Sequence, residues 1–126
     1  MKKKIVFIMM LVITLTGSYI GTTAAINELV EAPHLTAKPA DQVVKEGQTI
    51  QIDAVVTGTP KPTVVFYKNN KTIEEDTRIS INEDKGRHTL TIKNAKIEDS
   101  AIYLVVAQNK AGIAQATCEI HVSTIK

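Results

Sequence analysis

Alternation of apolar and polar residues with a period of two is the feature that most constrains the fold of this chain. From Gln48 to Val56, the apolar side chains Ile50, Ile52, Ala54 and Val56 occupy every second position. In an extended strand these four side chains lie on one face, and the residues between them lie on the other. Such a segment buries one face and exposes the other, which predicts a β-sheet and not a helix.

Further strand signals follow at short spacing, separated by Gly, Pro, Asn or Asp. The segment Gly58–Pro62 is a loop because proline has no ladder donor, and Asn69-Asn70 predicts a tight turn. The predicted strands are Leu35–Val44, Gln48–Val56, Thr63–Lys68, Lys71–Ile73, Arg78–Ile81, His88–Lys93, Tyr103–Gln108 and Ile113–Val122. Seven or eight strands in about 90 residues is the density of an immunoglobulin-type β-sandwich.

The first 25 residues have the order of a secretory signal peptide. Three lysines at positions 2–4 precede the apolar run Ile5–Leu15, and small residues lead up to Ala24 and Ala25. We expect cleavage after Ala24 or Ala25 and secretion of the remainder. An uncleaved membrane anchor is the alternative, because no charge lies between Ile5 and Asn27. A chance apolar leader on a cytosolic protein is the third interpretation.

These patterns divide the chain into a signal peptide (1–25), a linker (26–32), one folded domain (33–123) and a tail (124–126). Removal of the leader takes three lysines from the 15 basic residues and leaves 12 against 13 acidic ones, a net charge of −1. There is no basic patch with interleaved aromatic residues, so nucleic acid is not an expected partner.

Several motifs in order resemble an intermediate-set (I-set) immunoglobulin domain over about residues 33–123. The most specific are Asp99-x-Ala101-x-Tyr103 and Asn109-x-Ala111-Gly112. The resemblance implies an all-β sandwich of two antiparallel sheets. It also implies that the Tyr103 hydroxyl bonds back to the chain upstream, and that Arg78 and Asp99 form a salt bridge at one end of the sandwich.

The departures from the family pattern are as informative. The two disulfide cysteines of the family correspond to Ala54 and Val105, and its core tryptophan corresponds to Phe66. The intersheet disulfide is therefore lacking. Loss of such a bridge typically costs about 2 to 5 kcal/mol, so packing of the core must compensate.

Cys118 is the only cysteine, so its role needs an explanation. It shares the parity of Ile120 and Val122, which the family turns inward, and we expect a buried thiol that acts as a small apolar residue. An intermolecular disulfide is the alternative. Cys118 and His121 do not form a metal pair, because residues three apart on a strand point to opposite faces.

No residues point to catalysis, a cofactor or a bound metal. The three histidines are scattered, and glycine-rich phosphate loops are absent. The acidic runs 74–76 and 83–84 lack the spaced ligands and turn glycine of a calcium loop, so we interpret them as solvated surface. Asn70 begins an Asn-Lys-Thr sequon in the predicted tight turn, an exposed place for N-glycosylation.

A candidate protein-binding face follows from strand parity. If Phe66 and Val105 point inward, then Val65, Tyr67, Leu104 and Val106 point outward on adjacent strands. Four clustered apolar side chains form a candidate interaction patch. Strand propensity alone is the competing explanation, since Val and Tyr favour strands wherever they lie.

Two functions remain open. The first is a non-enzymatic extracellular recognition or adhesion module, resembling small secreted immunoglobulin proteins of neuronal and other cell surfaces, with a protein partner. The second is a structural domain of the muscle type, similar to the disulfide-free domains of titin- and twitchin-like proteins in the cytosol of the sarcomere. The leader favours the first function and the missing disulfide favours the second.

Overall fold

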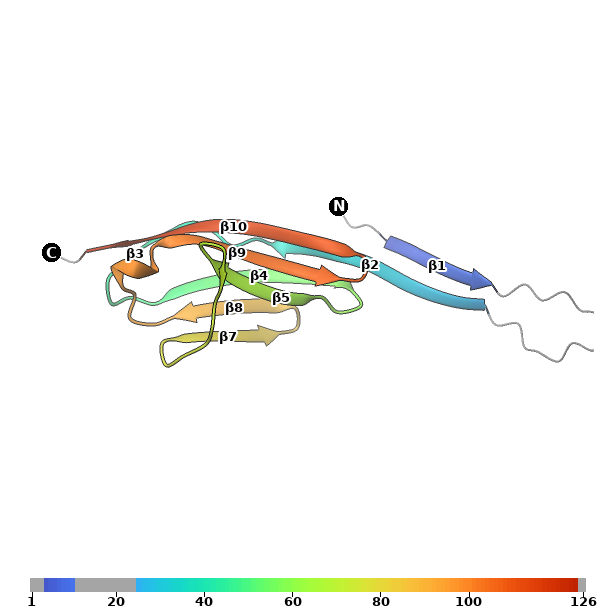
Figure 1. Cartoon of the computed structure of the whole chain (residues 1–126), viewed down its shortest axis with the longest axis horizontal. Coiled ribbons are helices and arrows are strands. Elements are labelled where there is room, and N and C mark those ends of the chain that lie inside the picture. Colours follow the sequence, from blue (N-terminus) through green and yellow to red (C-terminus); the bar gives the residue numbers. More distant parts are fainter. Residues whose placement is uncertain (1–3, 11–24, 125–126) are drawn as a thin grey trace, which may run out of the picture.

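The computed structural model describes residues 4–10 and 25–124, and its strands form a two-sheet sandwich (Figure 1). The strands are β1 (Lys4–Met10), β2 (Ala25–Ala37), β3 (Gln42–Lys45), β4 (Ile50–Thr59), β5 (Thr63–Lys68), β6 (Lys71–Thr72), β7 (Ile79–Asp84), β8 (Arg87–Ile92), β9 (Ala101–Asn109) and β10 (Gly112–Ser123). One sheet has the order β1-β2-β4-β8-β7 and the other β3-β10-β9-β5-β6. The predicted all-β sandwich is confirmed. One turn of 3₁₀ helix, η1 (Ile97–Asp99), precedes β9.

The core lies between the sheets, where the alternating side chains of β4 meet those of β5, β9 and β10. Ile50, Ile52, Ala54 and Val56 are all buried, as their parity predicted. Opposite them, Phe66 is 2% exposed in the place where the family has its tryptophan. Burial of each large aliphatic or aromatic side chain contributes about 1.5 to 3 kcal/mol, and this packing replaces the missing covalent link.

The N-terminal part of the domain differs from the prediction. We predicted one edge strand over Leu35–Val44, and this was wrong: β2 ends at Ala37 in one sheet, and β3 begins at Gln42 in the other, parallel to β10. The reason is the intervening Pro39, which cannot donate a ladder hydrogen bond and allows the chain to change sheets. β2 begins at Ala25, so residues 26–32 lie in a strand that extends beyond the sandwich beside β1 (Figure 1).

Tight turns fix the register of the hairpins. Asn69 and Asn70 both have positive φ, as a two-residue turn between β5 and β6 requires. The β7–β8 turn consists of Lys85 and Gly86, also with positive φ, and is shorter than the segment 82–87 that separates the two predicted strands Arg78–Ile81 and His88–Lys93. Most of the predicted signal peptide and tail lies outside the described residues; residues 4–10 of the leader form β1.

Candidate functional site

The structure brings the four residues of the candidate face together on the outer side of the β3-β10-β9-β5-β6 sheet. Val65 of β5 lies directly opposite Val106 of β9, and Tyr67 lies opposite Leu104. Phe66 and Val105, between them in sequence, are buried on the inner side. We call the outward side of this sheet the outer face.

Three further exposed residues enlarge the outer face, and the most exposed of them is Val43 of β3, at 75%. Ile102 of β9 is 53% exposed and Ile113 of β10 is 61% exposed, and both have outward parity. The sequence signal for Ile113 was present, because it is an odd number of residues from the inward-facing Cys118. Ile102 was missed because the predicted strand began one residue later, at Tyr103.

The opposite sheet provides an internal control for strand propensity. The outward side of β4 and β8 carries polar residues, among them Asp53, Thr89 and Thr91, and Thr89 Oγ1 donates to Asp53 Oδ1 at 2.6 Å. Among the exposed large apolar residues of the described chain, Val43, Val65, Ile102 and Ile113 belong to the outer face and none lies on β4, β7 or β8. Leu29 is exposed on β2 of the opposite sheet, in the part of that strand that pairs with β1. Strand propensity alone would place exposed apolar residues on the outward sides of both sheets, so it does not account for this difference between the outer face and β4, β7 and β8.

Asp99 is the centre of a polar cluster at one end of the sandwich. The residue is 4% exposed, and its carboxylate accepts from Arg78 Nη1 at 3.0 Å and Nη2 at 3.2 Å. Burial by itself raises the pKa of Asp99, but hydrogen bonds from Arg78 and the Lys96 backbone outweigh it, so the pKa lies below its ordinary value. The carboxylate is enclosed by protein atoms, so the cluster serves the fold.

Tyr103 completes this end of the sandwich. Its hydroxyl donates to the backbone oxygen of Asp99 at 2.6 Å, four residues upstream. Burial raises the pKa of Tyr103 far above its ordinary value, so the hydroxyl stays protonated and serves as a donor.

Cys118 is buried, with 2% of its surface exposed. Burial raises the pKa of its thiol to about 11, so little of the reactive thiolate exists at neutral pH. The side chain packs in the core beside Ile120 and Val122, which leaves it out of reach of a partner's cysteine in the folded domain.

Asn70 is exposed in the β5–β6 turn, and Thr72 of the same sequon is exposed in β6. The preceding residue, Asn69, is fixed by bonds in both directions: its amide donates to Ile102 O at 3.0 Å, and its Oδ1 accepts from Ile102 N at 3.2 Å. The turn is therefore fixed to β9 and leaves Asn70 exposed to solvent.

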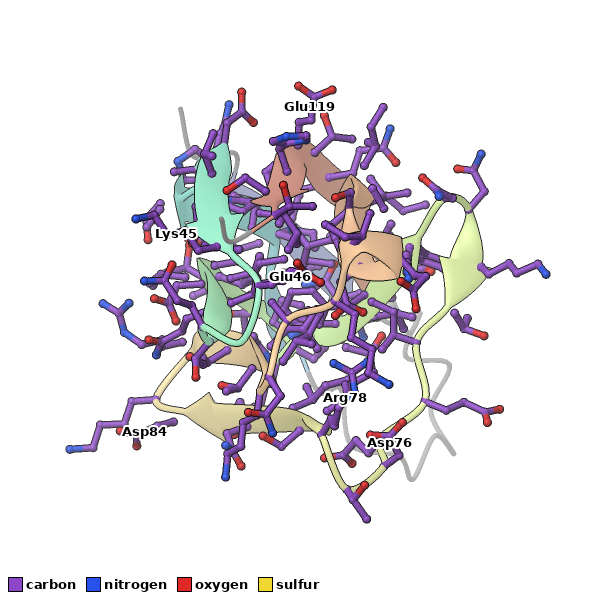
Figure 2. All side chains as sticks on the ribbon, turned by 90° about the vertical axis from the view of Figure 1, so that its left-hand side faces the viewer. Lys45, Glu46, Asp76, Arg78, Asp84 and Glu119 are labelled. Atoms are coloured by element: carbon purple, nitrogen blue, oxygen red, sulfur yellow. The ribbon has the colours of Figure 1, made fainter. Side chains whose placement is uncertain are left out.

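The acidic runs are more ordered than solvated surface requires. Asp76 Oδ1 accepts from the amides of Arg78 and Ile79, and Glu75 Oε1 accepts from the amide of Ile81. Figure 2 shows Asp76 on the loop that leads into β7, near Arg78. Across residues 4–10 and 25–124, no three His, Cys, Asp or Glu side chains gather as a metal site.

The two sheets, the Tyr103 hydroxyl bonded back to η1 and the Arg78–Asp99 ion pair define an immunoglobulin-like domain. The model of the immunoglobulin I-set domain matches residues 33–122, and the chain belongs to this family. In the part of the chain that the structure describes, no helix is long and apolar enough to cross a membrane.

Curated relatives and solved structures agree with this assignment. The chain is 38% identical over 92 residues to the muscle M-line assembly protein unc-89 of Caenorhabditis elegans, covering 71% of this chain and 1% of that protein. It is 32% identical to human myotilin, covering 78% of this chain and 20% of myotilin. Across the similar curated proteins compared, the chain spans between 1% and 20% of the relative's length.

Among solved structures, a chimeric titin Z1Z2 matches with a TM-score of 0.73 and 30% identity, covering 76% of this chain and 98% of that one. A titin complex with an obscurin-like 1 immunoglobulin domain matches with a TM-score of 0.73 and 28% identity, covering 75% of this chain and 97% of the other. The expected likeness to titin-type domains is confirmed.

Proposed function

We propose that this chain is a non-enzymatic, protein-binding immunoglobulin domain of the structural type found in muscle filament proteins, and that it binds through the outer face. The observation that carries the proposal is the apolar outer face of one sheet, which has no counterpart on β4, β7 and β8 of the other. Apolar residues clustered on a surface mark protein contacts. The central pair Tyr67 and Leu104 combines an aromatic anchor with an aliphatic neighbour, and aromatic anchors of this kind are enriched in binding hot spots.

The muscle-type assignment draws support from the core and from the relatives. Ala54 and Val105 are both buried in the core where the family has its disulfide, so the fold does not depend on an oxidising compartment. Unc-89 is named for M-line assembly, and the similar solved structures include titin in complex with another immunoglobulin domain. By analogy, we place this chain in the cytoplasm beside a filament protein.

A secreted recognition module is the second candidate, and the N-terminal sequence favours it. The three lysines at positions 2–4 and the apolar run Ile5–Leu15 have the order of a signal peptide. On this proposal Asn70 carries a glycan, because its turn is exposed.

Expression of the full chain with a C-terminal tag in animal cells separates the two. A cytosolic protein of full length supports the muscle-type proposal. A protein in the medium that has lost about 25 residues and shifts on glycosidase treatment supports the secreted module instead. Asn70→Gln is the control for the glycan, since it removes the acceptor and leaves the turn polar.

A further inference from the structure

The outer edge of β7 is a place where the sheet could continue into another molecule. β7 pairs with β8 on one side, and it is the last strand in the order of its sheet. A strand at the end of a sheet presents backbone N–H and C=O groups to any other strand, which invites association between chains. Ile79 and Ile81 alternate along β7 and pack, partly buried, against the core, so β7 is held in place at this edge of the sheet.

The segment just before β7 occupies this edge. The Asp76 amide donates to Ile79 O at 3.0 Å, and Asp76 Oδ1 accepts from Ile79 N at 2.9 Å. Glu75 Oε1 accepts from Ile81 N at 2.9 Å. The outward amides of Ile79 and Ile81, which a partner strand would need, are thus bonded within the chain.

Charged side chains also protect the outer edge of β7. Backbone hydrogen bonds from Arg78 and Ile79 hold the pKa of Asp76 below its ordinary value, so the carboxylate stays ionised at neutral pH. Farther along β7, the Glu83 carboxylate accepts from Gly86 N at 3.0 Å and from Lys61 Nζ at 3.2 Å. Charged side chains along an edge disfavour the approach of a second strand.

We propose that Glu75 and Asp76 guard the outer edge of β7, and that a domain with this guard removed pairs through β7 with β7 of a second copy. Antiparallel pairing of two identical strands is self-complementary about a two-fold axis. It would supply partners for the amides of Ile79 and Ile81 that the acidic side chains now occupy. This latent contact lies on the other sheet from the outer face and is independent of it.

Glu75→Ala and Asp76→Ala are the test variants, and Glu74→Ala is the matched control because Glu74 is an exposed neighbour of the same charge. Amide hydrogen exchange of the full chain reports on Ile79 and Ile81. Sedimentation velocity at rising protein concentration reports on association. We expect at least tenfold faster exchange of Ile81 in Glu75→Ala and a dimer in the Glu75→Ala, Asp76→Ala double variant, the tenfold being about 1.4 kcal/mol of lost protection.

Ile81→Pro, added to the double variant, tests whether the association uses β7, because it removes the outward amide that pairing needs. Return to a monomer with a folded circular dichroism spectrum supports pairing through β7. The proposal is overturned if the double variant stays monomeric, or if Glu74→Ala associates equally. Binding through the outer face is measured separately, so failure here leaves the proposed function standing.

Discussion

Asp99 shows how much of this fold depends on single polar residues. It accepts two bonds from Arg78 through its carboxylate, and its backbone oxygen accepts the hydroxyl of Tyr103. A buried carboxylate without these donors would be costly, because it would have lost water without gaining a partner. The residue thus links η1 with β9 and with Arg78, the residue just before β7, at one end of the sandwich.

Replacing Arg78 by Ala should destabilise the domain by about 2 kcal/mol at neutral pH, less than for a fully buried pair because Arg78 is partly exposed. The pKa of Asp99 is lower in the folded protein than its ordinary value of 3.8. The ion pair therefore stabilises the fold fully at pH values above 3.8, and this contribution is lost as the pH falls through the lowered pKa of the folded state. Urea unfolding of both proteins at pH 7 and pH 3 should show a smaller difference in acid. An equal difference at both values would contradict the ion-pair explanation.

Cys118 should resist thiol reagents in the folded protein. Burial raises its pKa to about 11, so little of the thiol is ionised to the reactive thiolate at neutral pH. The same burial keeps reagents from reaching the sulfur atom. We expect no labelling by an aromatic disulfide reagent under native conditions, and one equivalent in denaturant. Rapid labelling of the native protein, or a reductant-sensitive dimer, would instead favour the intermolecular disulfide.

At the scale of elements, the β7–β8 hairpin requires a glycine at position 86 for two separate reasons, one conformational and one steric. Gly86 has φ of +86°, and a Cβ there would lie 2.8 Å from Val56 O. Gly47 has nearly the same φ, +87°, but a Cβ there would meet nothing within 4 Å. The two positions therefore separate backbone strain from a steric clash.

Gly47→Ala should cost about 1 kcal/mol, which is the strain of positive φ alone. Gly86→Ala should cost distinctly more, about 2 to 3 kcal/mol, because the backbone at Val56 must also move. Thermal or urea unfolding of the two variants provides the comparison. Equal losses would mean that the hairpin relaxes freely around the added methyl group.

Period-two alternation was sufficient to predict β4, β5 and the hairpin of β9 and β10, because one face of each is buried and the other is not. It did not predict the change of sheet between Ala37 and Gln42, since β2 and β3 have the same local pattern and only their partner strands differ. The guard formed by Glu75 and Asp76 was also missed. An acidic run in sequence gives no sign of which backbone amides its carboxylates will accept.

For the molecule as a whole, the sandwich separates two kinds of apolar side chain that the sequence places next to each other. Leu104 and Val105 are consecutive residues of β9, one on the outer face and the other in the core. In the proposed function, the first contributes to binding and the second to stability. Substitution of each by the same polar residue distinguishes these roles.

Val105→Asp should unfold the domain, because an uncompensated carboxylate in the core costs several kcal/mol, comparable with the whole stability of a small domain. Leu104→Asp should change the stability by less than about 1 kcal/mol, since its side chain is only partly buried. The same variant should lower partner binding at least tenfold, and Thr91→Asp on the opposite sheet should leave it unchanged. Circular dichroism melts and pull-down from muscle extract measure the two effects. Normal binding by Leu104→Asp would exclude the outer face as the contact, and unfolding of that variant would assign Leu104 to the core.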